Sequence, residues 1–223
     1  MAMHQDIAQD VEVFEGLLDS ALDYWAAPDR LNHWHWRLPL RQLVLDYRVS
    51  GVFPEERLSK FVDYLMDLKL QIYFVQTSWV QLVNWVPPPS GVGPTILGET
   101  RRAFLARMAL DQALIGQVRI VWERLFNAVY YVEVGHDLDA KRSKKARFFR
   151  AIRNIPRWQP LLQAEALLED YDNRFRTPEF HRSSNIRANI LRQRFFSPLD
   201  LLEPMNPAMQ IVPETIMSAV RGQ

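Results

Sequence analysis

The chain has 223 residues, 48% of them hydrophobic and 12% aromatic, and this composition excludes an intrinsically disordered protein. Its formal net charge of +1 excludes a molecule that attracts nucleic acid through its overall charge, and the absence of cysteine excludes disulfides and thiolate zinc sites. The N-terminus has no apolar signal core and no apolar run reaches the length of a membrane span, so we expect a cytoplasmic protein that contacts no membrane.

The first predicted element is an amphipathic helix over residues 5–27, with an acidic outer face and a stop at Pro28. Seven carboxylates lie in residues 1–30, against one basic residue. Residues 32–36 then read Asn-His-Trp-His-Trp, which we interpret as a connector packed by its tryptophans. A metal site that uses His33, His35 and His136 is a much weaker alternative, because no third ligand lies near the first two. Pro39–Val49 is a short helix closed by Gly51.

Two long helices follow. Apolar residues recur in steps of three and four from Leu58 to Val86, and again over Glu99–His136. The stretch between them, Pro87–Gly98, contains four prolines and three glycines and is predicted to be a loop. Two long apolar stripes that face each other indicate an all-α fold, an antiparallel helical bundle with two long central helices.

A polar turn over Asp137–Arg142 precedes a basic helix at Ser143–Asn154. Residues 140–157 carry eight lysines or arginines and no acid. The spacing directs Phe148, Phe149 and Ile152 inward. The basic side chains would then form either a solvated face or a track for a phosphate backbone, and their pattern leaves both readings open; the candidates are Lys144, Lys145, Arg147 and Arg150.

A helix over Pro160–Tyr171 leads to a polar motif. Thr177-Pro178-Glu179 has the form of a helix start, with Thr177 as an extended N-cap, and the new helix continues to about Phe195. In this register Arg176 and His181 converge over a helix N-terminus, where Arg176 could hold a phosphate and a neutral His181 could move a proton. The alternative is that His181 is a surface residue and that Arg176 pairs with Asp172 or Glu179. Beyond Pro198 we expect a proline-punctuated tail with a last helical turn or two at Glu214–Val220.

The motif Arg176-Thr-Pro-Glu-Phe-His181 resembles the signature of the HEPN superfamily, an Arg and a His separated by four to six residues in an all-helical chain. Trp122–Asp137 and Lys144–Ile152 resemble upstream helices of a prokaryotic branch, so the likeness covers roughly residues 99–195. It implies a bundle that dimerises with two motifs facing a shared groove. Many such proteins are metal-independent endoribonucleases of toxin, antiviral-defence or RNA-processing systems, and others are inactive relatives that bind nucleotides or partners.

We expect a single all-helical domain over residues 1–223, and the resemblance implies the roles of its residues. The domain comprises an N-terminal helical extension (1–53), a HEPN-like bundle (about 54–197) and a C-terminal tail (198–223). Arg176 would stabilise the phosphate and His181 would transfer protons while RNA is cleaved to a 2′,3′-cyclic phosphate, without metal or cofactor. The expected partners are RNA, a second copy of the chain, and an antitoxin or another protein. The substrate-binding candidates are Asn173, Arg174, Glu179 and Arg182, with Lys144, Lys145, Arg147 and Arg150 of the basic helix.

The same resemblance leaves a second function open. In active members the residue after the arginine is often Asn, Asp or His, whereas Thr177 stands here. A catalytically inactive helical module that binds a nucleotide, a nucleic acid or a protein partner is therefore the alternative.

Overall fold

A computed structural model describes residues 2–25, 38–86, 94–139, 143–177 and 206–222. Every regular element in these ranges is a helix, which confirms the all-α class. The α-helices are α1 (Ala2–Trp25), α2 (Leu40–Ser50), α3 (Leu58–Val83), α4 (Pro94–Val134), α5 (Lys144–Ile152), α6 (Gln159–Tyr171) and α10 (Asn206–Arg221). Three short turns complete them: η1 (Glu55–Arg57), η2 (Pro156–Trp158) and the π-helical turn η3 (Asp172–Arg176). None of these helices combines the length and the apolarity that a membrane-spanning segment needs.

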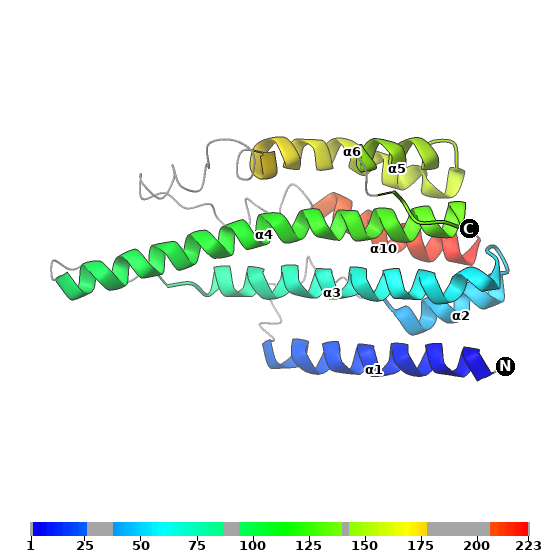
Figure 1. Cartoon of the computed structure of the whole chain (residues 1–223), viewed down its shortest axis with the longest axis horizontal. Helices are drawn as coiled ribbons and strands as arrows, with labels where there is room; N and C mark the ends of the chain where they lie inside the picture. Colours follow the sequence, from blue (N-terminus) through cyan, green and yellow to red (C-terminus); the bar gives the residue numbers. More distant parts are fainter. Residues whose placement is uncertain (1, 26–37, 87–93, 140–142, 178–205, 223) are drawn as a thin grey trace.

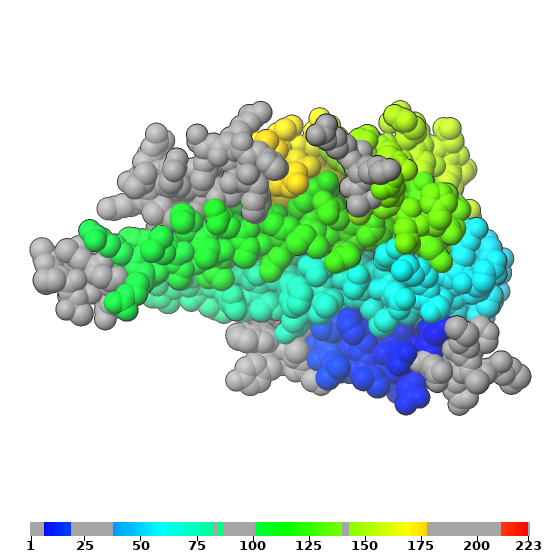
Figure 2. Space-filling model, in the orientation of Figure 1, coloured from blue at the N-terminus to red at the C-terminus, as the bar shows by residue number. Residues whose placement is uncertain are grey.

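The antiparallel pair of α3 and α4 forms the centre of the bundle, as predicted (Figure 1). The predicted stripes are buried in one core: Leu65, Leu68, Ile72 and Val75 of α3, with Val118, Trp122, Leu125 and Val129 of α4. Figure 2 shows the two helices side by side along one face of an elongated molecule. The α3 stripe ends sooner than predicted, because the helix stops at Val83 and Val86 is 78% exposed.

The other helices pack around this pair. Helix α1 lies against α3 and α2, α5 lies against α4 and α6, and α10 packs against α2, η2 and α6 (Figure 1). The predicted inward residues of α5, Phe148, Phe149 and Ile152, are all buried.

The C-terminal segment differs from the prediction. Residues 206–221 form a 16-residue helix with Pro213 inside it, where two turns at most were expected. A proline inside a helix loses one hydrogen bond and costs about 3 kcal/mol. Here the helix persists because one of its faces is buried, with Val212, Ile216, Ala219 and Val220 in the main core.

The loop prediction is also wrong at one end, because α4 begins at Pro94 and residues 94–98 are helical. Proline fits the first turn of a helix, where no backbone N–H is needed for an intrahelical bond. The remainder of the predicted loop, residues 87–93, lies outside the described residues.

Glu15 does not lie on the acidic outer face that the sequence predicts for α1. Its Oε1 accepts hydrogen bonds from the Leu40 backbone N–H at 2.9 Å and from Lys69 Nζ at 2.6 Å. Helix α2 has no side-chain N-cap of its own, since Pro39 precedes it. Glu15 therefore satisfies one free N–H at the positive end of α2 and joins three helices.

The C-terminus of α4 is capped from a distant part of the chain. Arg57 Nη1 donates to the backbone oxygens of Val132 at 2.9 Å and Glu133 at 3.3 Å. Gly135 follows the helix with a φ of +86°, and a Cβ atom there would lie 2.6 Å from Arg57 Nη2. The backbone conformation therefore favours glycine, and an added Cβ would also push the Arg57 guanidinium away from the helix end.

We expect Gly135→Ala to lower the free energy of unfolding by more than about 1 kcal/mol, because alanine is strained at positive φ and displaces Arg57 from the helix end. Gly16→Ala is the matched control. Gly16 is helical with nothing within 4 Å of an added Cβ, so the same substitution should stabilise α1 by about 0.5–1 kcal/mol. Urea denaturation of both variants checks this. If Gly135→Ala were as stable as Gly16→Ala, the Arg57 cap would not depend on Gly135.

Candidate functional site

Arg176 is the only residue of the predicted catalytic pair that the structure describes. It lies at the end of η3, which continues α6 without a break, and its side chain is 31% exposed. His181, Glu179 and Arg182 lie outside the described residues.

The predicted N-cap at Thr177 is wrong. Thr177 has helical angles, φ −64° and ψ −45°. Its backbone N–H donates a hydrogen bond to the backbone carbonyl oxygen of Asp172, five residues earlier. The helix continues past Tyr171 because Tyr171 and Phe175 are both buried, with ring centroids 5.3 Å apart. This burial outweighs the preference of a residue before proline for extended backbone. Arg176 therefore lies within a helical segment and not next to an extended N-cap residue.

The Arg176 side chain belongs to a group of charges that we call the Asp172 cluster: Arg119 and Glu123 of α4, with Asp172 and Arg176 of η3. Asp172 Oδ1 lies 3.8 Å from Arg119 Nε and 4.0 Å from Arg176 Nη1. Arg119 Nη2 lies 3.8 Å from Glu123 Oε1. The alternative interpretation of the sequence, in which Arg176 faces Asp172, is therefore correct for this pair.

Arg119 is an unusual member of the cluster because two of its buried nitrogen atoms lack a hydrogen bond. Its side chain is 11% exposed, and its Nε and Nη1 atoms have no hydrogen-bond partner among the described residues. Asp172 Oδ1 is likewise buried and has no hydrogen-bond donor within that part of the chain, since 3.8 Å exceeds the range of an N–H···O bond. Burial lowers the pKa of the Arg119 guanidinium, whereas Asp172 and Glu123 raise it, and the group stays cationic at neutral pH. Buried polar groups of this kind are rare in folded proteins.

The first turn of α5 reaches the same region. Burial lowers the pKa of Lys144, Glu123 raises it, and the positive charges of Arg124 and Arg119 lower it further. The structure thus brings two sequence-predicted residues, Lys144 and Arg176, close enough to Arg119 for each to interact with its charge.

The other predicted contacts are spread along η3 and α5. Arg174 is exposed and pairs with Asp170 at 3.3 Å, and Asn173 is exposed beside it. On α5, Arg147 pairs with Asp139 at 3.6 Å and Arg150 is exposed. Lys145 is half-buried on the same helix.

The basic run does not act as one surface, because its C-terminal end has a structural role. Arg157 Nε donates to Glu133 Oε1 at 2.7 Å, and its guanidinium lies 4.8 Å from the Phe53 ring centroid. Trp158 Nε1 donates to the same carboxylate oxygen at 2.5 Å. The Glu133 side chain is only 8% exposed, so Arg157 compensates a buried charge and joins α4 to η2.

The histidine-based metal alternative finds no support in the described residues. His136 is exposed, and its ring lies 5.4 Å from that of Tyr130. No group of three His, Cys, Asp or Glu residues within the described ranges is arranged to hold a metal ion. His33 and His35 lie outside those ranges.

Arg119 and its pairing with Asp172 were missed by the sequence analysis. The signal was present: Arg119 lies four residues after Ile115 and three before Trp122, within the register of the buried stripe. A basic residue in that register needs a carboxylate partner. Nothing in the sequence indicated that Asp172, 53 positions further on, would supply it.

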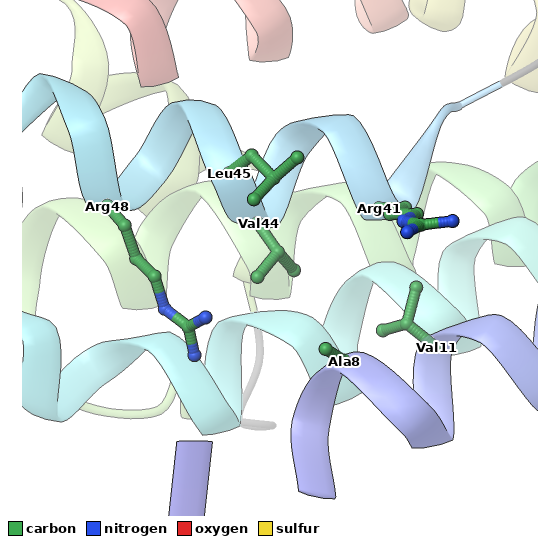
Figure 3. Close-up of a pocket in the computed structure, with 6 residues that line it drawn as sticks. All are labelled: Ala8, Val11, Arg41, Val44, Leu45 and Arg48. Atoms are coloured by element: carbon green, nitrogen blue, oxygen red, sulfur yellow. The ribbon is translucent and has the colours of Figure 1, made fainter. Parts of the chain in front are cut away.

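A separate groove lies between α1 and α2 (Figure 3). Its volume is about 150 Å³, and it is lined by Ala8, Val11, Arg41, Val44, Leu45 and Arg48. In Figure 3 the two arginines stand at opposite ends of an apolar floor, and Arg48 also pairs with Glu55 at 3.3 Å. None of the sequence-predicted site residues lines it, and α3 and α4 separate it from α6 and η3 (Figure 1).

The two roles within the basic run predict different effects on stability. We expect Arg157→Ala to lower the free energy of unfolding by about 1–3 kcal/mol, because it leaves the Glu133 carboxylate buried and partly unpaired. Arg150→Ala, at an exposed position of α5, should stay within about 0.5 kcal/mol of the wild type. Chemical denaturation measures both. An unchanged Arg157→Ala variant would mean that Glu133 does not need this partner.

Comparison of the chain with protein-family models, with curated proteins and with solved structures found no significant match. The resemblance to the HEPN superfamily therefore stays a prediction that rests on the Arg176–His181 spacing and on the residues around it.

Proposed function

We propose that the protein is a metal-independent endoribonuclease of HEPN type. The observation that carries the proposal is the position of Arg176. It lies on the helical segment that precedes His181 in the chain, it is partly exposed, and its charge acts on Arg119, which in turn acts on Lys144. A phosphate that approaches this region meets positive charge from α4, α5 and η3.

In this mechanism His181 removes the proton of a ribose 2′-hydroxyl, whose oxygen attacks the adjacent phosphorus. The bond from phosphorus to the 5′-oxygen breaks, and that oxygen takes up a proton, which leaves a 2′,3′-cyclic phosphate and a 5′-hydroxyl. Arg176 stabilises the negative charge that develops on the phosphoryl oxygens. Exposed basic residues of α5, Arg150 foremost, hold the flanking phosphates.

The proposal includes a second copy of the chain, so that two motifs face one groove that receives single-stranded RNA. It places the protein in the cytoplasm, in a toxin or antiviral-defence system with an antitoxin or another protein as regulator.

One observation favours the second candidate, a non-catalytic HEPN-like module. Arg176 already has a carboxylate partner 4.0 Å away in Asp172, which reduces the charge that it offers to a phosphate. A module of this kind would bind a nucleotide, a nucleic acid or a protein without cleaving RNA.

Incubation of the purified protein with a single-stranded oligoribonucleotide in EDTA separates the two candidates. We expect cleavage by the wild type and a loss of at least about 100-fold in kcat/KM for Arg176→Ala and for His181→Ala. Arg153→Ala is the matched control, because Arg153 is an exposed arginine outside the assigned site whose carboxylate partner, Glu165, also lies 4.0 Å away. RNA binding without cleavage would favour the module. Cleavage that is unaffected by both substitutions would rule out the assigned site.

The role of α5 is tested by binding. Arg150→Ala should weaken RNA binding similarly for all sequences and lower the slope of log affinity against log salt by about 0.7, the value for one phosphate contact in a single strand. Fluorescence anisotropy at several salt concentrations measures this slope. A slope identical to that of the wild type would remove Arg150 from the RNA-binding surface.

A further inference from the structure

The carboxylate of Asp172 lies between two guanidinium groups and makes a hydrogen bond to neither. Its Oδ1 atom is 3.8 Å from Arg119 Nε and 4.0 Å from Arg176 Nη1. We propose that Arg119 is a positioning residue that holds the Asp172 carboxylate away from Arg176 and so keeps the Arg176 guanidinium available to a phosphate. This inference rests on the proposed function of Arg176.

The same segment contains an internal comparison. Asp170 and Arg174 form a second Asp–Arg pair with the same spacing of four residues, two positions earlier in the chain. That pair closes to 3.3 Å, and no second cation is paired with Asp170 among the described residues. In the Asp172–Arg176 pair the closest atoms are 4.0 Å apart. Unlike Asp170, Asp172 also faces a second arginine, Arg119 of α4, at 3.8 Å.

The difference in burial between the two arginines explains which of them attracts the Asp172 carboxylate more strongly. Arg119 is 11% exposed and Arg176 is 31% exposed. Charges attract more strongly where water is excluded, and water can solvate the more exposed guanidinium in place of the carboxylate. Two N–H groups of Arg119 have no acceptor among the described residues, which increases the benefit of a nearby carboxylate. The negative charge of Asp172 therefore mainly offsets the positive charge of Arg119. The positive charge of Arg176 is offset less and can attract a phosphate.

The π-helical turn makes this sharing geometrically feasible. It brings Asp172 to α4, against which η3 packs, while Phe175 anchors the turn in the core. Arg176, the first residue of the motif, lies on the same turn and is partly exposed. Without Arg119, the Asp172 carboxylate would close onto Arg176 as Asp170 does onto Arg174, and it would compete with a phosphate for the same guanidinium.

The test uses four variants in the RNA-cleavage assay: Arg119→Met, Asp172→Asn, the double variant, and Arg119→Lys. We expect Arg119→Met to raise KM about fivefold with kcat changed less than about twofold, because Asp172 then competes for Arg176. The double variant should return KM to within about twofold of the wild type, since the competing carboxylate is gone. Asp172→Asn alone should not raise KM, and Arg119→Lys should stay near the wild type because it keeps the positive charge.

These outcomes separate positioning from direct contact. If KM of the double variant stays as high as that of Arg119→Met, Arg119 contacts the RNA itself or only supports the fold, and the proposal is wrong. Should Arg119→Met not fold, a raised KM for Asp172→Asn would overturn the proposal equally. Melting temperatures of all variants identify losses that come from unfolding.

A second readout does not depend on ribonuclease activity. Phenylglyoxal modifies accessible guanidinium groups, and peptide mass spectrometry gives its rate at Arg176. We expect Arg119→Met to slow this modification and Asp172→Asn to accelerate it, with the rate at Arg174 as the internal control. If Arg176→Ala cleaves RNA like the wild type while these rates shift as expected, the proposed function fails and the positioning role stands. Rates that do not respond to either substitution overturn the positioning role.

Discussion

The packing of α3 against α4 provides the apolar surface against which the other helices assemble. Each helix carries an apolar stripe more than four turns long, and neither stripe can stay in water without a large cost in free energy. Once the two stripes face each other, they leave grooves on both sides that only further apolar faces can fill. Helices α1 and α2 complete the core on the α3 side, and α5 completes it on the α4 side, while α10 joins α2 to α6.

At the borders of this core, several polar groups pair with residues that are distant in the sequence. Glu15 caps α2, Arg57 caps α4, and Glu133 accepts hydrogen bonds from Arg157 and Trp158. These contacts fix how the helices are joined, because a buried charge without its partner would cost several kcal/mol. The Asp172 cluster is different. Its charges are in place, but their distances are too long for hydrogen bonds, and such imperfect pairing is typical of functional sites.

This contrast divides the cationic residues into two groups. Arg57 and Arg157 hold helices together and are committed to the fold. Arg176 is as exposed as Arg157, at 31%, but its carboxylate partner lies 4.0 Å away instead of 2.7 Å, and Arg150 is exposed; both features suit groups that bind a charged ligand. Arg119 differs from both groups, since it is more buried than Arg157 and yet as loosely paired as Arg176. Its position between α4 and η3 links the central helix pair to the segment that carries the proposed catalytic motif.

Local patterns in the sequence predicted the elements whose cause is local. The three-four rhythm of apolar residues predicted α3, α4 and the inward face of α5, because side chains at this spacing share one side of any helix. Glycine after α2 and proline before α3 marked their boundaries for equally local reasons. The motif at Arg176 was visible as a spacing, although His181 lies outside the residues that the structure describes.

Tertiary contacts decided the remainder. Thr177 is helical although its own sequence favours an N-cap, because Tyr171 and Phe175 are buried beneath it. Residues 206–221 are helical across Pro213, because that helix covers part of the core. Arg119 meets Asp172 only after α4 and η3 have packed together. In each case the free energy comes from contacts between residues far apart in the chain, and no local pattern can encode the identity of a distant partner.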